Sequence, residues 1–370
     1  MTKKSGSPLL ISLILGLLLL FAPGQGTAAA LVCTTSWANA AGGSWDTGGN
    51  RTAGVPVASS DVCIDLAGTY TVTLIGAKSV NSVTLGNVSG VQTLLIRGSN
   101  AGGNAKLTSA TGITNVGTIT LDTIDSTWSS TLKVTTGALA NRLGGVINVN
   151  QGAGGARTIT ANLTNDGTVN LNQSTTFNGG TRTYANNAAF NIAATKTLTI
   201  SGGSNTFTQT AGTLDIDGVL NWTGISGSFN MNGGTLDLSV GSCTKKGGSF
   251  DYIGGVILGN PTLSLTKVNL TLGAGGVSPA IFRMRGTSTL TGNNLAGQAL
   301  LIQGSSAGGN ARLTSATGFT NFGSIILDTI DSTWSSTLKV TTGTPTNPVG
   351  RVINIDQGAG GARTPQPGVG

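Results

Sequence analysis

A short motif that recurs along the chain places the strongest limit on what it can fold into. The pattern apolar-x-x-x-Gly-x-apolar-x-apolar occurs as ITNVGTITL (113–121) and FTNFGSIIL (319–327). Related segments begin at Phe207, Phe229 and Phe250, which are 22 and 21 residues apart. Within each motif apolar residues alternate with polar ones, which is the period of a half-buried β-strand. The sequence therefore predicts a short strand about every 20 residues.

The residues before each strand predict a sharp corner. Asn-x-Gly or a near equivalent precedes the strand, as in Asn165-Asp166-Gly167, and Asn and Gly adopt positive φ at low cost. Short strands and corners at this spacing are typical of a β-solenoid, in which each coil covers its neighbour's inward face. We predict an all-β fold: a right-handed parallel β-helix or β-solenoid with an N-terminal cap and about 15 coils of about 20–22 residues. A pair of β-sandwiches is the alternative, but its turn signals would recur every ~8–12 residues.

The sequence also contains a much longer repeat, in addition to the short motif. Residues 94–157 reappear at 300–363, and 49 of the 64 aligned positions are identical. The offset of 206 residues is too long for one coil, so it indicates a duplicated block of coils. The predicted organisation is a signal peptide (1–30), a cap with the first coils (31–79), a β-solenoid (80–299) and a truncated second copy of the 94–157 segment (300–370).

The composition supports strands over helices and excludes several chemistries. Gly accounts for 59 of the 370 residues, and Gly costs a helix about 1 kcal/mol per site. The chain has no His and no Glu, which excludes His-based triads, imidazole zinc sites and a His pH switch. Its 20 Lys and Arg residues outnumber its 13 acidic residues but are scattered, so no nucleic-acid partner is predicted.

The N-terminus has the pattern of a secretory signal. Lys3 and Lys4 precede the apolar run LLISLILGLLLLFA (9–22), and Ala28 to Ala30 form an A-x-A cleavage site. The run of 14 apolar residues is shorter than the ~20 that cross a bilayer, which argues against the alternative of a retained anchor. We therefore expect secretion to the cell exterior or cell surface, with no membrane span after signal removal.

Three cysteines lie in the exported part of the chain. An oxidising compartment favours a disulfide between Cys33 and Cys63, which leaves Cys243 free. A lipoprotein signal at Cys33 is the alternative, but the bulky Val32 beside it fits that signal poorly. Three Cys without His do not supply the four ligands of a structural zinc site, and neither a metal nor a cofactor is predicted.

The most specific local pattern is WANAAGGSWDTGGNRTAGVPVASSDVCIDL at residues 37–66. Its order of Trp, Gly-x-Trp, Asn, Gly-Val-Pro and Asp-Val-x-Ile resembles the opening module of exported bacterial β-solenoid repeat proteins. These are surface proteins similar to autotransporter-associated β-strand repeats and filamentous adhesins. The resemblance implies that Trp37 and Trp45 cap the first coil. In that pattern a Trp usually follows the residue matched by Asn50, and here Arg51 takes its place.

Parallel β-helices also host polysaccharide lyases and hydrolases, which use two or three converging carboxylates. Asp215 and Asp217 would share one face of a strand. The nearest catalytic candidates form two copies of one pair: Asp122 with Asp125, and Asp328 with Asp331. Asp at strand ends more often accepts local backbone hydrogen bonds, and the duplication would separate two half-sites. We therefore expect no enzyme, with a carbohydrate-active enzyme using clustered Asp as the alternative.

Two other residue types could bind ligands. Trp128 and Trp334 could stack on sugars, although a corner Trp more often packs on the neighbouring coil. T-x-T pairs could form an ice-binding face, but Thr118-Ile-Thr120 becomes Ser324-Ile-Ile326 in the second copy, so the array is not kept. The sequence thus predicts a secreted structural or adhesive β-solenoid that presents Thr, Ser and Asn ladders to surface glycans or proteins.

Overall fold

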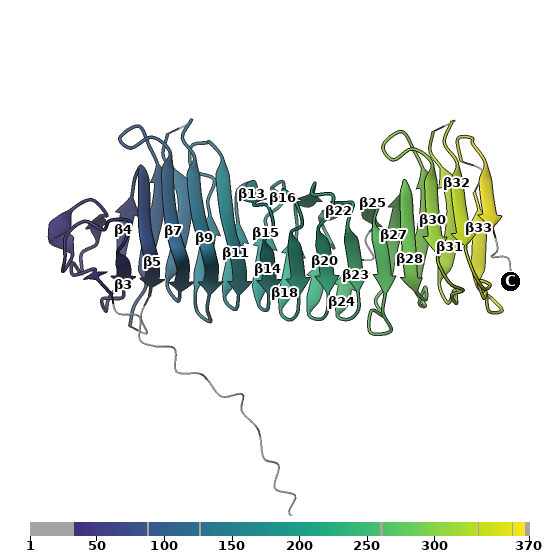
Figure 1. Cartoon of the computed structure of the whole chain (residues 1–370), viewed down its shortest axis with the longest axis horizontal. Helices are drawn as coiled ribbons and strands as arrows, with labels where there is room; N and C mark the ends of the chain where they lie inside the picture. The colour runs from purple at the N-terminus through teal and green to yellow at the C-terminus, as the bar shows by residue number, and fades with distance from the viewer. Residues whose placement is uncertain are drawn as a thin grey trace, which may run out of the picture. The chain divides into compact units, whose positions relative to one another are not determined.

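The computed structural model describes residues 33–86, 89–125, 127–259, 262–331, 333–356 and 358–366, and the expected signal peptide lies outside them. These residues form an all-β parallel β-solenoid of about 14 coils with roughly 23 residues each (Figure 1). They contain no α-helix, and a single 3-10 turn, η1, spans Gly48–Asn50. The prediction of a parallel β-solenoid is confirmed.

Each coil contributes strands to as many as three faces. Four long strands bend from face 1 to face 2: β5 (Ala77–Leu85), β7 (Ala105–Asn115), β9 (Ser130–Asn141) and β11 (Arg157–Asn165). Face 1 continues through β13 (Thr175–Asn178), β16 (Thr197–Ser201), β19 (Val219–Trp222), β22 (Ser242–Lys246), β25 (Thr262–Thr266), β27 (Ala280–Arg285), β29 (Gln298–Gly304), β31 (Ser324–Thr329) and β33 (Val352–Ile355).

Face 2 begins with β1 (Thr35–Ser36) and β3 (Asp61–Ile64) and, after the long strands, continues through β14 (Thr183–Asn186), β17 (Thr206–Gln209), β20 (Ser228–Met231), β23 (Ser249–Tyr252), β26 (Asn269–Leu272), β28 (Thr287–Gly292), β30 (Ala311–Ser315), β32 (Ser336–Val340) and β34 (Arg363–Gln366). Face 3 is a separate sheet of β2 (Gly43–Ser44), β4 (Tyr70–Leu74), β6 (Gln92–Gly98), β8 (Thr118–Thr123), β10 (Val146–Val149), β12 (Thr168–Leu171), β15 (Ala189–Ile192), β18 (Thr213–Ile216), β21 (Thr235–Asp237) and β24 (Val256–Leu258).

Coil length differs between the middle of the solenoid and the duplicated segments. Phe207, Phe229 and Phe250 stack in register with the predicted spacings of 22 and 21 residues. In the first copy, however, Leu94, Ile119 and Ile147 are in register at spacings of 25 and 28 residues, which is longer than predicted. The additional residues form loops at the coil corners, and Figure 1 shows these longer loops over both duplicated segments.

The interior is lined by apolar side chains from every face. Aromatic rings form a continuous stack through the middle coils. Phe207, Phe229 and Phe250 lie nearly parallel, with centroid distances of 5.4 and 5.0 Å. Offset or parallel ring contacts of this kind add to the free energy gained from burial, so the middle coils hold one another in register.

An asparagine ladder runs through the same interior. Asn115, Asn141 and Asn165 each donate from Nδ2 to the side-chain oxygen of the next residue at 2.7 Å, as far as Asn186. Asn186 ends the ladder by donating to Gln209 Oε1 at 2.8 Å. All five side chains are fully buried, so these hydrogen bonds satisfy polar groups that would otherwise be costly.

The predicted positive φ occurs at some of the corners only: Gly234, which ends Asn232-Gly233-Gly234, has a φ of 62°. Gly117, Gly167 and Gly323, which end other Asn-x-Gly motifs, do not have positive φ, and their Asn residues point inward. The glycines are required by close approach between coils: a Cβ at Gly167 would lie 2.2 Å from the carbonyl oxygen of Gly145. Asn is selected here for its hydrogen bonds across coils.

The two copies of the duplicated segment lie on different faces. Ile96 in β6 lies on face 3, in register with Leu121 of β8. Its equivalent, Ile302 in β29, lies on face 1, in register with Leu327 of β31. The offset of 206 residues therefore corresponds to whole coils plus one further face. Near the second copy the third side is held by parallel bridges such as Asn294 with Asn321.

The N-terminal coils carry a buried aromatic cluster that contains Trp37 and Trp45. Trp37 and Trp45 are buried, and Trp37 stacks on Tyr70 with a centroid distance of 6.2 Å. The Arg51 guanidinium lies between the two indoles, 4.9 and 4.4 Å from their centroids. Burial lowers the pKa of Arg51 to about 10. A planar guanidinium can stack on aromatic rings, so Arg51 packs against both indoles in this cluster.

Candidate functional site

The outward side of face 1 carries two rows of polar side chains, which we call the hydroxyl rows. Side chains in each row are in register across successive coils, at the ~4.8 Å spacing of paired strands. The first row comprises Thr131, Thr158, Thr176, Thr199, Asn221, Thr244, Ser264 and Arg283. The second comprises Lys133 with Thr160, Asn178 with Ser201, and Lys246 with Thr266 and Arg285. Alternation along each strand places these groups outside and the apolar residues inside.

A hollow of about 190 Å³ lies in the hydroxyl rows over β19, β22 and β25. Its outward lining consists of Asn221, Thr223, Thr244, Lys246, Ser264 and Thr266. Arg283 and Arg285 of β27 pair in register with Ser264 and Thr266 and border the hollow. Hydroxyl, amide and cationic groups thus meet at one concave place on this face.

A buried lysine lies beneath the hollow. Lys245 is 2 % exposed, and its Nζ donates to the carbonyl oxygens of Gly227 and Gly247 at 2.7 and 2.9 Å. The ammonium also lies 4.3 Å from the centre of the Trp222 ring. Burial lowers the pKa of Lys245 to about 8. Cys243, the free cysteine, is buried two residues away, and burial raises the pKa of its thiol to about 12.

Face 3 presents a different outward surface. Asn170 and Asn191 donate to the side-chain oxygens of Asn148 and Asn170 at 2.9 and 2.8 Å. The same row continues with Asp215 and Asp237, which are paired in register. Burial raises the pKa of Asp215, and the neighbouring Asp217 and Asp237 charges add to that effect. This acidic surface contrasts with the cationic end of the hydroxyl rows.

The T-x-T pair at Thr118 and Thr120 also lies on face 3. The next coil places Val146 and Asn148 in register with these two threonines. The threonines therefore do not form a stacked T-x-T array here. Thr118 is instead in register with Thr93 and Thr71 of the preceding coils, as a single row of threonines, and longer rows of hydroxyl groups occur on face 1.

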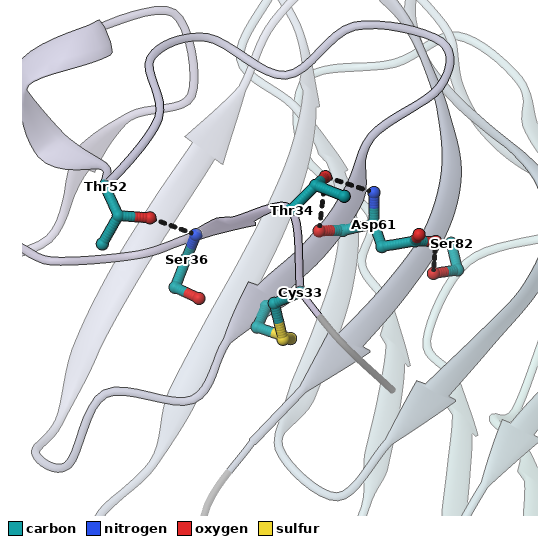
Figure 2. Close-up of a disulfide and its surroundings, with 7 residues drawn as sticks. Cys33, Thr34, Ser36, Thr52, Asp61 and Ser82 are labelled. Atoms are coloured by element: carbon teal, nitrogen blue, oxygen red, sulfur yellow. Dashed lines mark hydrogen bonds between the residues drawn. A yellow bond between two sulfur atoms is a disulfide. The ribbon is translucent and has the colours of Figure 1, made fainter. Parts of the chain in front are cut away.

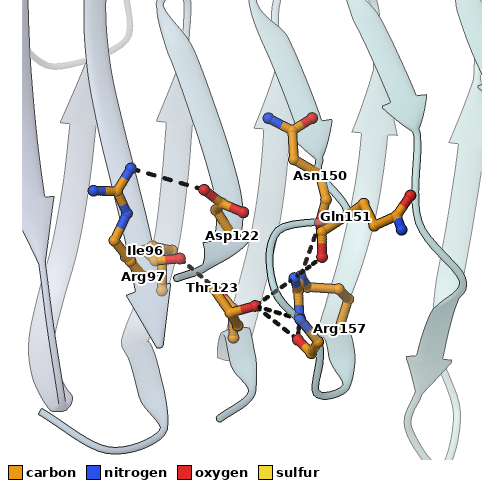
Figure 3. Close-up of polar contacts among 9 residues, drawn as sticks. Ile96, Arg97, Asp122, Thr123, Asn150, Gln151 and Arg157 are labelled. Carbon is orange, nitrogen blue, oxygen red and sulfur yellow. Dashed lines mark hydrogen bonds and ion pairs between the residues drawn. The ribbon is translucent and has the colours of Figure 1, made fainter. Parts of the chain in front are cut away.

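Among the first catalytic candidates, Asp122 lies at a corner between two arginines (Figure 3). Its Oδ2 is 3.7 Å from Arg97, and its Oδ1 is buried beneath the following loop, where a Cβ at Gly152 would lie 2.4 Å away. Arg157 is 1 % exposed and donates to Thr123 Oγ1 at 3.0 Å and to the Gln151 carbonyl oxygen at 2.6 Å. Burial lowers the pKa of Arg157, which the Asp122 charge partly opposes. Arg157 thereby fixes the loop at residues 150–156, which covers Asp122.

The other three candidates also contact neighbouring coils. Asp125 accepts a hydrogen bond from the backbone N–H of Asn100, and Asp331 accepts the equivalent one from Ser306. Asp328 accepts from Gln303 Nε2 at 2.9 Å. Each copy therefore uses its carboxylates in the same way, to tie one coil to the preceding one.

Trp128 and Trp334 are half-buried and pack over a small loop of the preceding coil. A Cβ at Gly103 would lie 3.5 Å from the Trp128 ring, and Gly309 has the same relation to Trp334. Trp128 Nε1 donates to Asn100 Oδ1 at 2.8 Å. The rings thus contact the neighbouring coil and leave part of their surface open.

Cys33 and Cys63 form a disulfide with a Cα–Cα distance of 5.7 Å (Figure 2). Beside it, the backbone N–H of Asp61 donates to Thr34 Oγ1 at 2.9 Å. In the described ranges, one group of three potential metal ligands has its donor atoms within 4.8 Å, namely Cys33, Cys63 and Asp65. Two of these three are bonded to each other, so the group does not offer a set of thiolate ligands. A disulfide is consistent with an extracellular protein.

Together these features define an all-β parallel β-solenoid with a polar, partly cationic outer face. Comparison with protein-family models, curated proteins and solved structures found no match for the chain. In the described part of the chain, no helix has the length and hydropathy that a membrane crossing requires.

Proposed function

We propose that the protein is a secreted or cell-surface structural and adhesive β-solenoid, without catalytic activity, whose hydroxyl rows bind glycans or partner proteins. The observation that carries the proposal is the register of these rows. Stacked strands hold Thr, Ser and Asn side chains at a fixed spacing, so a ligand meets donors and acceptors that are already ordered. The disulfide and the expected signal peptide support export.

The role of the carboxylates supports a non-catalytic protein. Asp122 pairs with Arg97 beneath a closed loop, and Asp125 accepts a backbone hydrogen bond. Carboxylates engaged in this way are poorly placed to transfer protons to a glycosidic oxygen. The alternative, a polysaccharide lyase or hydrolase, predicts release of oligosaccharides by the wild type and loss of that release in the Asp122→Asn variant.

Binding of the purified protein to a panel of polysaccharides and to intact cells tests the proposal. We expect retention on at least one surface without release of soluble sugar. Replacing Thr176 and Thr199 by Val keeps the shape of the rows and removes two hydroxyls, so retention should fall. Thr168→Val on face 3 is the matched control and should bind as wild type. Equal retention of both variants would contradict the role of the hydroxyl rows.

A further inference from the structure

The cationic end of the hydroxyl rows has an imbalance of charge. Arg283 and Arg285 project two residues apart from β27, and Lys246 lies in register with Thr266 and Arg285. None of the described face 1 strands from β13 to β27 contains a carboxylate. Adjacent cations without intervening anions create a positive potential that attracts an anionic ligand.

The two arginines retain unused hydrogen-bonding capacity. Arg283 Nε and Arg285 Nε are buried and donate to no described residue. Arg285 uses one terminal nitrogen to donate to Gln303 Oε1 at 2.8 Å, and Gln303 in turn donates to Asp328. Asp328 is thus reached only through the Gln303 amide. Asp331 acts on Arg285 through its charge without forming an ion pair, which partly opposes the lowering of the Arg285 pKa by burial and by the Arg283 charge. Planar guanidinium groups match the two oxygens of a carboxylate or sulfate.

The surface beside the arginines suits the uncharged part of such a ligand. The hollow of about 190 Å³ is lined by hydroxyl and amide groups from three successive coils. From Asn221 across the hollow to the bordering Arg283, the surface spans three strand spacings, or about 14 Å, which is long enough for several linked sugars. Hydroxyl groups both donate and accept, as sugar hydroxyls do.

We propose that this hollow binds an acidic polysaccharide, with its carboxylate or sulfate groups on Arg283, Arg285 and Lys246 and its sugar hydroxyls along the hydroxyl rows. The inference rests on the proposed function, because it names the ligand class for the same face. It goes further in predicting that anionic glycans are preferred over neutral ones. Salt should weaken the binding, because partly exposed charges are screened.

Calorimetric titration with an oligogalacturonate, a sulfated heparin oligosaccharide and neutral dextran tests this inference. We expect wild type to bind at least one acidic probe at least about tenfold more tightly than dextran, with the carboxylated and sulfated probes distinguishing the preferred anion. The R283Q/R285Q variant should lose at least about tenfold in affinity for that probe. K339Q removes a cation from β32 on face 2, away from the hydroxyl rows, and should bind as wild type.

A second variant distinguishes a loss of binding from a loss of the fold. Lys246 is exposed, so K246Q should keep the circular dichroism spectrum of wild type and still weaken binding of the acidic probe. Unchanged affinity in folded R283Q/R285Q and K246Q, or equal affinity for dextran, would overturn the inference while the proposed adhesive function stands. Binding to no glycan would overturn both the inference and the glycan part of the proposed function.

Discussion

Replacing Lys245 by Met should remove a pH dependence of stability that the wild type shows. Lys245 Nζ is held in the interior by the carbonyl oxygens of Gly227 and Gly247 and by the Trp222 ring. Two neutral acceptors and one ring do not replace the water that an ammonium loses on burial. The folded state therefore favours the neutral amine more than the unfolded chain does.

The size of the effect follows from the displaced pKa. Burial moves the pKa of Lys245 from its ordinary value of 10.5 to about 8, which corresponds to about 3 kcal/mol at ~1.4 kcal/mol per pH unit. Below pH 8 both states are protonated, and the folded state carries the full cost. Between about pH 8 and 10.5 the unfolded chain binds the additional proton, so the free energy of unfolding rises with pH. Above that window the cost is absent.

Urea denaturation of wild type and Lys245→Met at a series of pH values provides the assay. The difference in their free energies of unfolding should change by about 3 kcal/mol across the window, because other titrating groups are common to both proteins. The pH dependence is the decisive quantity, since Met also leaves the two carbonyl oxygens without this donor. Lys106→Met makes the same change at an exposed site and should show no such trend. A constant difference between Lys245→Met and wild type would refute the reasoning.

Three further predictions concern the scaffold. Asn141→Ala should lower the free energy of unfolding by about 2–4 kcal/mol, because it removes the hydrogen-bond partner of two buried side chains, Asn115 and Asn165. Asn115→Ala, at the end of the ladder, should lower it by about half as much. Urea denaturation that finds Asn115→Ala the more destabilising of the two would contradict the ladder. Reduction of Cys33–Cys63, which closes 30 residues, should cost about 3–4 kcal/mol, and hydrogen exchange should show the loss in the N-terminal coils first. Gly167→Ala should cost about 1–3 kcal/mol, since its Cβ would meet backbone oxygen at 2.2 Å; an unchanged melting temperature would count against this contact.

The fold could be predicted because its signals are local and repeated. Alternation of apolar and polar residues marks each strand, and the recurrence of Phe207, Phe229 and Phe250 indicates the coil. The longer coils of the duplicated segments were missed because their additional residues lie in loops, which have no hydrophobic period. A spacing measured in the middle of the chain therefore underestimated the coil length elsewhere.

The interior ladder and the cationic hollow required information that one coil does not contain. Asn before Gly is favoured at a corner with positive φ, but the same residue also suits a ladder between coils. The recurrence of Asn115, Asn141 and Asn165 at one place in successive motifs was the available signal. Lys246 and Arg285 are far apart in sequence, and only strand register brings them to one surface.

The displacement of Ile302 from the face that holds Ile96 has a consequence for growth by duplication. Every further insertion of the same 206-residue unit would turn its features by a third of the circumference, so three insertions would restore the starting orientation. A protein lengthened in this manner would distribute identical patches as a slow spiral around its axis. Such a protein could bind partners on any side of its axis, although the patch on each single coil faces only one direction.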